Sequence, residues 1–221
     1  DQLEEACAPS EQFERMTRDA DGTLVYKKIP AREFGPYDRI EKPEEIAYTG
    51  DKGYKLADVY NKKITMDEFI AQLSDEQLIM LFHAEGMCSP KVTAGTACAF
   101  GGLTEELRAL GIPATCTTDG PSGLRMDCGT KAFSLPNGTL IGCTFDLELA
   151  QKLYEMTGYE LRRNRVDSLL GPGMNIHRNP LNGRNFEYIS EDPLVTGKMA
   201  AAQIKGLGIV GSTGTIKHFA T

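Results

Sequence analysis

The sequence lacks the features of a membrane, nucleic-acid or secreted protein. No apolar run reaches the length of about 18 residues that a membrane helix needs. The chain starts at Asp1 without a basic and then apolar leader, so we expect no secretion signal, although the missing initiator Met leaves an upstream segment open. A net charge of −7 leaves no excess of Lys and Arg for a nucleic-acid backbone.

Cofactor motifs are also lacking. The six cysteines form no C-x-x-C pair, and no His and Cys spacing is typical of zinc. Several lie in apolar stretches, where a free thiol acts as a small hydrophobic group, so we interpret them as reduced and expect a cytoplasmic location. No P-loop motif occurs, and the G-x-G-x-x-G match at 206–211 follows a predicted helix and precedes a strand, so we predict a loop there. We expect neither metal nor cofactor.

What the sequence does have is a hydrophobic content of 41%, distributed over alternating strand-like and helix-like segments. Capping boxes at 65–68 and 74–77 predict two short helices. For the rest of the chain the pattern predicts, in order, a flexible loop at 95–102, a helix over about 104–110, a strand at 112–118, a strand at 139–145, a helix capped by Asp146, a strand at 166–170, a helix over about 194–207 and a strand at 214–220. The alternation predicts a parallel sheet or barrel.

A long polar loop at 171–193 follows the strand predicted at 166–170 and is the most informative part of the chain. Its Gly and Pro residues prevent a helix or strand from continuing. Ordered loops of this length are uncommon unless they bind something. Residues 191–193 within it favour the start of a helix, because Asp can cap and Pro suits the first turn. We therefore predict a ligand-contacting loop.

Polar residues at strand ends have two interpretations each. Asp119 follows a strand and is either a turn residue or a carboxylate that accepts ligand hydroxyls. Arg184 and Glu187 are either an exposed ion pair or a guanidinium held in a cleft. Lys217 and His218 stand within an apolar strand, where an unpaired Lys is costly, so function is favoured there.

Three motifs carry a family resemblance. Residues 118–125, 170–193 and 217–219, in this order, resemble glycoside hydrolase family three β-glucosidases. The resemblance covers roughly residues 64–221. The sequence of residues 175–187 is closer to that of the β-glucosidases than to that of the β-xylosidases. It implies an α/β fold, an incomplete (β/α)₈ TIM-type barrel with about the first five strands, and retaining hydrolysis of β-glucosides or cello-oligosaccharides.

The resemblance also implies which residues bind the sugar in the −1 subsite: Asp119, Arg125, Arg184, Lys217 and His218. This composition suits a sugar independently, because hydroxyls need a carboxylate to accept their hydrogen bonds and Arg, Lys and His to donate to them. The family further implies a cis peptide bond between Lys217 and His218.

The catalytic carboxyl groups are expected elsewhere. Retaining hydrolysis requires a nucleophile and an acid/base residue about 5–5.5 Å apart, and in the family the nucleophilic Asp lies in a Ser-Asp-Trp-type segment. This chain has no Trp and stops at Thr221. We therefore expect the 221 residues alone to hydrolyse nothing, and the remainder of the same polypeptide to be their partner.

The N-terminal part suggests an upstream domain. Residues 1–50 are rich in charge and proline and resemble the end of the fibronectin-like domain that precedes the barrel in one family subgroup. Residues 51–64 would then be a linker, and 65–221 the first part of the barrel domain. A catalytically inactive carbohydrate-binding relative, another exo-β-glycosidase such as a β-xylosidase, and a nucleotide-binding α/β protein remain as alternatives, and a homo-oligomer stays open.

Overall fold

The structure is a computed structural model that describes residues 13–29 and 44–218. The chain divides into two compact units, Asp1–Ile46 and Ala47–Thr221. The predicted linker, 51–64, therefore falls within the second unit. There its apolar side chains pack with the nearby helices around a small core cluster.

The described part of the first unit is a β-hairpin. Strands β1 (Phe13–Arg18) and β2 (Leu24–Ile29) pair antiparallel. The Gly22 amide donates to the Asp19 carbonyl over 2.9 Å and closes the turn between them. Whether this unit ends a fibronectin-like domain stays a prediction, and residues 1–12 and 30–43 of it lie outside the described residues.

The second unit contains a sheet of five strands in the order β3-β4-β5-β6-β7. The strands are β3 (Glu85–Gly86), β4 (Cys98–Gly101), β5 (Ala114–Asp119), β6 (Ser168–Leu170) and β7 (Thr213–Gly214). The last three are parallel neighbours, as predicted, whereas β4 runs antiparallel to both of its neighbours, β3 and β5. Residues 219 and 220 of the strand predicted at 214–220 lie outside the described residues.

The flexible loop predicted at 95–102 is wrong for half of its residues, which form β4. Its glycines permit close strand pairing: a Cβ on Gly102 would lie 1.9 Å from the Ile112 carbonyl oxygen. The Gly102 amide instead donates to the Pro113 carbonyl over 2.9 Å. At Gly102 the absence of a side chain permits this close backbone approach, whereas Gly101 also has a positive φ of 87°.

Seven α-helices and one 3₁₀ helix accompany the strands in the described residues. They are α2 (Leu56–Tyr60), α3 (Met66–Ala71), α4 (Asp75–Phe82), α5 (Glu105–Ala109), α6 (Gly138–Cys143), α7 (Leu147–Arg163), η1 (Asn185–Glu187) and α8 (Pro193–Ile209). Both predicted capping boxes are confirmed, with Thr65 and Ser74 as N-caps. Asp146 caps α7 and Asp192 caps α8, also as predicted, because each carboxylate accepts amides of the first turn.

Helix α6 replaces the strand predicted at 139–145. The Asn137 side chain accepts the Leu140 amide over 2.9 Å and begins the helix. Gly142 faces the chain that follows η1, where an added Cβ would lie 2.6 Å from the Ile189 carbonyl oxygen. The apolar run therefore packs against a distant segment as a helix, and this contact outweighs its strand-like composition.

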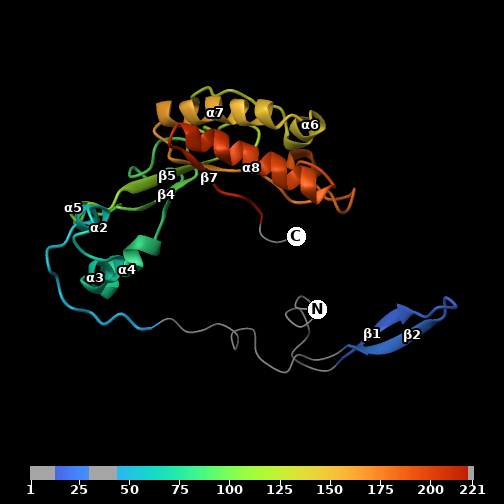
Figure 1. Cartoon of the computed structure of the whole chain (residues 1–221), viewed down its shortest axis with the longest axis horizontal. Helices are drawn as coiled ribbons and strands as arrows, with labels where there is room; N and C mark the ends of the chain where they lie inside the picture. The colour runs from blue at the N-terminus through green and yellow to red at the C-terminus, as the bar shows by residue number, and fades with distance from the viewer. Residues whose placement is uncertain (1–12, 30–43, 219–221) are drawn as a thin grey trace. The chain divides into compact units, whose positions relative to one another are not determined.

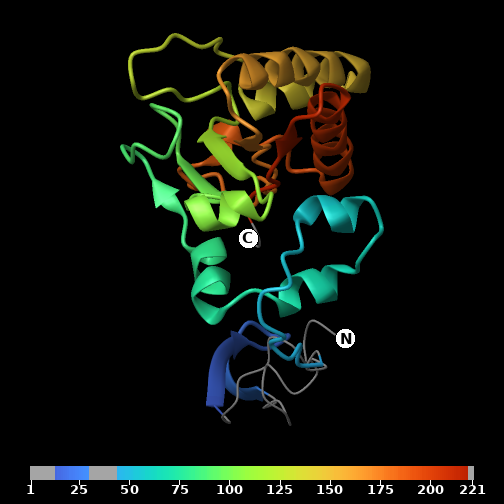
Figure 2. The ribbon, with the colours of Figure 1, turned by 90° about the vertical axis from the view of Figure 1, so that its left-hand side faces the viewer.

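Helices α7 and α8 lie side by side next to the sheet (Figures 1 and 2). Gly206 allows this approach, because a Cβ there would lie 2.2 Å from the Gln151 carbonyl oxygen of α7. The segment 206–211, predicted as a loop, is consequently helical as far as Ile209. On its other side α8 covers β7, where a Cβ on Gly214 would meet the Ile204 side chain at 2.6 Å.

The main core lies between these two helices and the strands, and it fixes the end of β5. Tyr154 of α7 and Leu169 of β6 are almost fully buried. The Tyr154 hydroxyl donates to the Pro121 carbonyl over 2.8 Å, two residues beyond Asp119. Burial raises the pKa of Tyr154, so this hydroxyl stays protonated and the contact persists. The core thereby positions the first polar residue of the candidate site.

The described residues lack a membrane-spanning helix, a disulfide and a cluster of metal-ligating side chains. None of their helices is both long and apolar enough to cross a membrane. The five cysteines among them form no disulfide, and no three His, Cys, Asp or Glu side chains gather there as metal ligands would.

Candidate active site

Three chain segments meet at the carboxyl ends of the parallel strands. The end of β5 provides Asp119, the loop after β6 provides residues 171–192, and the chain after β7 provides Lys217 and His218. The last two segments are joined through their backbones: the Lys217 amide donates to the Pro172 carbonyl over 3.1 Å, and the Lys217 carbonyl accepts from the Met174 amide over 2.8 Å. The predicted cis bond between Lys217 and His218 is confirmed.

Asp119 and Lys217 form an ion pair across these segments. The Lys217 Nζ and Asp119 Oδ1 atoms are 2.6 Å apart, and the exposed fractions of the two side chains are 15% and 39%. Partial burial opposes ionisation of Asp119, but the hydrogen bond and charge of Lys217 and the Gly120 amide together bring its pKa below the ordinary value. Asp119 is thus a carboxylate with one oxygen committed to a cation.

Arg184 and Glu187 form a second ion pair at η1. The Arg184 Nε atom donates to Glu187 Oε1, and the exposed fractions of their side chains are 49% and 7%. The Glu187 carboxylate raises the pKa of Arg184 through this hydrogen bond. Because the pair uses Nε, the two terminal nitrogens of the guanidinium make no hydrogen bond within the described residues and are available to a ligand.

The pKa of His218 depends on the charges of both ion pairs. Partial burial lowers the pKa of His218, and the positive charges of Arg184 and Lys217 lower it further. The carboxylates of Glu187 and Asp119 oppose this shift. The contacts agree with this: His218 follows Lys217, which pairs with Asp119, and its ring contacts Tyr188, which follows the Glu187 partner of Arg184.

Two further residues hold His218 in place. Its backbone amide donates to Asn175 Oδ1 over 2.6 Å. Its ring Nδ1 lies 3.1 Å from the Tyr188 hydroxyl, and the two rings pack edge to face with centroids 6.0 Å apart. Sequence reasoning missed both residues. The available signal was their position inside the polar loop at 171–193, where a buried Asn or Tyr needs a polar partner.

The side chain of Arg125 makes no hydrogen bond or ion pair with the other predicted residues. Its side chain is 63% exposed, and its Nε lies 3.1 Å from Asp127 Oδ2. Its charge still contributes to the lowered pKa of Asp119, and its backbone amide donates to the Asp119 carbonyl over 2.8 Å. It is a neighbour of the cluster, paired with a carboxylate of its own.

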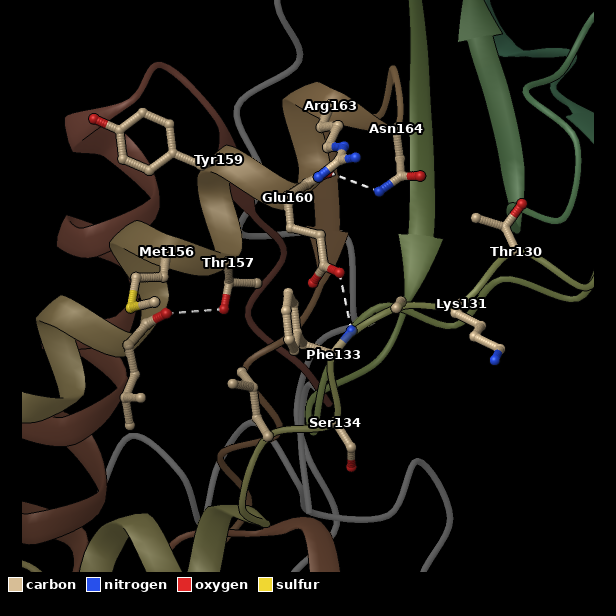
Figure 3. A pocket seen from close by; sticks show the side chains of 13 residues that line it. Thr130, Lys131, Phe133, Ser134, Met156, Thr157, Tyr159, Glu160, Arg163 and Asn164 are labelled. Atoms are coloured by element: carbon tan, nitrogen blue, oxygen red, sulfur yellow. Dashed lines mark hydrogen bonds between the residues drawn. The ribbon is translucent and has the colours of Figure 1, made fainter.

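A cavity of about 620 Å³ lies elsewhere, between the loop at 130–135 and α7 (Figure 3). Phe133 and Met156 contribute apolar walls, and the Glu160 carboxylate accepts the Phe133 amide over 2.9 Å. None of the predicted site residues lines this cavity. We place the candidate site at the charged cluster instead, because charged donors and acceptors from three chain segments lie together there, and binding of hydroxyls requires such groups.

The family of the chain follows from its similarity to known proteins. Residues 50–221 match the profile of the glycosyl hydrolase family 3 N terminal domain, and the chain belongs to this family. It is similar to a β-glucosidase of Ruminococcus albus, with 59% identity over 226 aligned positions that cover 99% of this chain and 23% of that protein.

Solved structures give the same result. The chain is similar to a β-glucosidase from Paenibacillus barengoltzii, with a TM-score of 0.84 and 51% identity over 96% of this chain and 24% of that one. It is also similar to β-glucosidase 3B from Thermotoga neapolitana in complex with glucose, with a TM-score of 0.62 and 35% identity over 69% of this chain and 22% of that one. The chain thus spans about a quarter of the length of these relatives.

Proposed function

We propose that the complete polypeptide is a β-glucosidase that releases terminal β-D-glucosyl residues with retention, and that this chain supplies the sugar-binding part of the site. Family membership and the names of the similar proteins support the proposal. The description of the Thermotoga structure adds glucose as a ligand of that relative. A β-glucoside or a cello-oligosaccharide is the proposed substrate.

The observation that carries the proposal is the convergence of Asp119, Arg184, Lys217 and His218 from three separate segments. In the proposed complex, Asp119 accepts hydrogen bonds from sugar hydroxyls, while Lys217 and the terminal nitrogens of Arg184 donate to them. Each charged group already has a protein partner of opposite sign, so the cluster stays ordered without ligand and little reorganisation accompanies binding.

The fold supports a barrel. Strands β5, β6 and β7 are parallel, and the candidate residues follow their carboxyl ends, as ligand residues do in (β/α)₈ barrels. We propose that the sheet is the first part of such a barrel, with the antiparallel β3 and β4 at its start. The nucleophile and the acid/base residue would come from the remainder of the polypeptide, and the 221 residues alone would not turn over substrate.

The test measures the complete polypeptide with nitrophenyl β-glucoside, β-xyloside and α-glucoside as parallel substrates. We expect the highest kcat/KM for the β-glucoside, with the β-anomer of glucose as the first product seen by NMR. Preference for the xyloside would support another exo-β-glycosidase. Glucose binding in calorimetry without turnover of any substrate would support the inactive relative. An inverted product would contradict the retaining mechanism.

A further inference from the structure

The hydroxyl of Tyr188 has a specific task that the ion pairs do not explain. The tyrosine is 4% exposed, and its hydroxyl lies 3.1 Å from Nδ1 of His218. No other hydrogen bond of this hydroxyl is found within the described residues. A buried phenol needs a partner for its proton, and here that partner is the imidazole.

The direction of this hydrogen bond follows from proton counting. A phenol has one proton to donate, and a neutral imidazole has one nitrogen that donates and one that accepts. If Nδ1 carried the ring proton, the phenol proton of Tyr188 would be buried without an acceptor. The arrangement that satisfies both groups has the hydroxyl donating to Nδ1, which puts the ring proton of His218 on Nε2.

The surroundings of His218 agree with a neutral ring of fixed orientation. Partial burial and the charges of Arg184 and Lys217 lower its pKa. Asn175 accepts the backbone amide over 2.6 Å, so His218 is held at its backbone by Asn175 and at its ring by Tyr188. Within the described residues Nε2 has no hydrogen-bond partner, which leaves its proton for a ligand.

We propose that Tyr188 is a positioning residue that fixes His218 as the Nε2–H tautomer, so that His218 offers a hydrogen-bond donor to an acceptor oxygen of the ligand. The identity of that ligand as a sugar rests on the proposed function. The tautomer itself does not, because it follows from the contact between the two side chains.

The first experiment observes the tautomer without substrate. The complete polypeptide is labelled with ¹⁵N in histidine, His218 is assigned through His218→Gln, and long-range proton–nitrogen correlations identify the protonated nitrogen. We expect Nε2–H in the wild type and a mixture of both tautomers in Tyr188→Phe, which keeps the ring and loses only the hydroxyl. Nδ1–H in the wild type, or an unchanged tautomer in Tyr188→Phe, would overturn the proposal.

The pKa of His218, measured on the same samples, tests the direction of the hydrogen bond independently. A hydroxyl that donates to Nδ1 stabilises the neutral ring, so Tyr188→Phe should raise the pKa towards the ordinary 6.5. A hydroxyl that accepts from Nδ1–H would stabilise the charged ring, and its removal would lower the pKa. A lowered pKa therefore contradicts the inference.

The second experiment measures kcat/KM for a nitrophenyl β-glucoside. We expect Tyr188→Phe to reduce it roughly three- to tenfold, the size of one neutral hydrogen bond. Tyr159→Phe on the exposed face of α7, where the side chain is 60% exposed, is the matched control and should change neither activity nor tautomer. Unchanged kcat/KM in Tyr188→Phe would refute the positioning role. A wild-type polypeptide without turnover would instead contradict the proposed function, while the NMR result decides the tautomer.

Discussion

Replacing Asp119 by Asn in the complete polypeptide tests the candidate site most directly. The substitution keeps the size of the side chain but removes the charge that faces Lys217 over 2.6 Å. It also weakens the acceptor that we propose for sugar hydroxyls. A hydrogen bond to a charged group is worth about 1.5–3 kcal/mol, and about 1.4 kcal/mol corresponds to tenfold in rate. We therefore expect kcat/KM for a nitrophenyl β-glucoside to fall by about ten- to 100-fold.

Stability should change far less than activity. Lys217 is only 15% exposed, but the amide oxygen of Asp119→Asn can still accept its hydrogen bond, and the 39% exposure at position 119 lets solvent screen the Lys217 charge. Asp58→Asn is a matched control, because Asp58 of α2 forms a 3.1 Å ion pair with Lys63 and contacts none of the predicted site residues. We expect the control to retain its kcat/KM within about twofold, since exposed pairs contribute little.

The reasoning can fail in two ways. If Asp119→Asn retains wild-type kcat/KM, Asp119 is not part of the sugar site. If activity and the midpoint of thermal unfolding fall together, the residue has a structural role and the loss of activity is a consequence of unfolding. The two measurements on the same protein preparations separate these outcomes from the expected one.

Two other substitutions test the electrostatics and the packing around the cluster. Arg184→Gln should raise the pKa of His218 in an NMR titration, because the guanidinium charge lowers it. In the wild type, the part of the unfolding free energy that is linked to this lowered pKa should be complete above about pH 6.5. It should decline as the pH falls below that value. Gly142→Ala should lower the free energy of unfolding by about 1–3 kcal/mol, since its Cβ would lie 2.6 Å from the Ile189 carbonyl oxygen. Gly197→Ala in α8, with no atom within 4 Å of its Cβ, should leave stability unchanged or increase it.

The sequence predicted what depends on local chemistry. The capping boxes at Thr65 and Ser74 form as expected, because the residues that satisfy the helix amides lie within one turn. Asp119 and Lys217 were also identifiable, one as a carboxylate after a strand and the other as a cation in an apolar run. That they pair with each other depends on the parallel order of β5, β6 and β7, which brings residues 98 positions apart into contact.

Contacts between distant segments explain what the sequence did not predict. Residues 139–145 are strand-like in composition, yet Gly138 and Gly142 of α6 lie against the backbone at Glu187 and Ile189, a contact with a distant segment that composition does not reveal. Asn175 and Tyr188 likewise carry no separate motif that marks them as partners of His218. Their roles arise when the loop after β6 folds back along the chain that follows β7.

The charge balance of the cluster bears on the kind of ligand it suits. Lys217 is paired with Asp119 and Arg184 with Glu187, so two cations are balanced by two carboxylates around the ring of His218. A site for an anionic ligand would be expected to leave a cation without a protein carboxylate, because the ligand then completes the pair. Here each carboxylate restrains a cation and leaves hydrogen-bond donors and acceptors available for uncharged hydroxyls. The pairing therefore favours a neutral pyranose over a sugar phosphate or a sugar acid at this position.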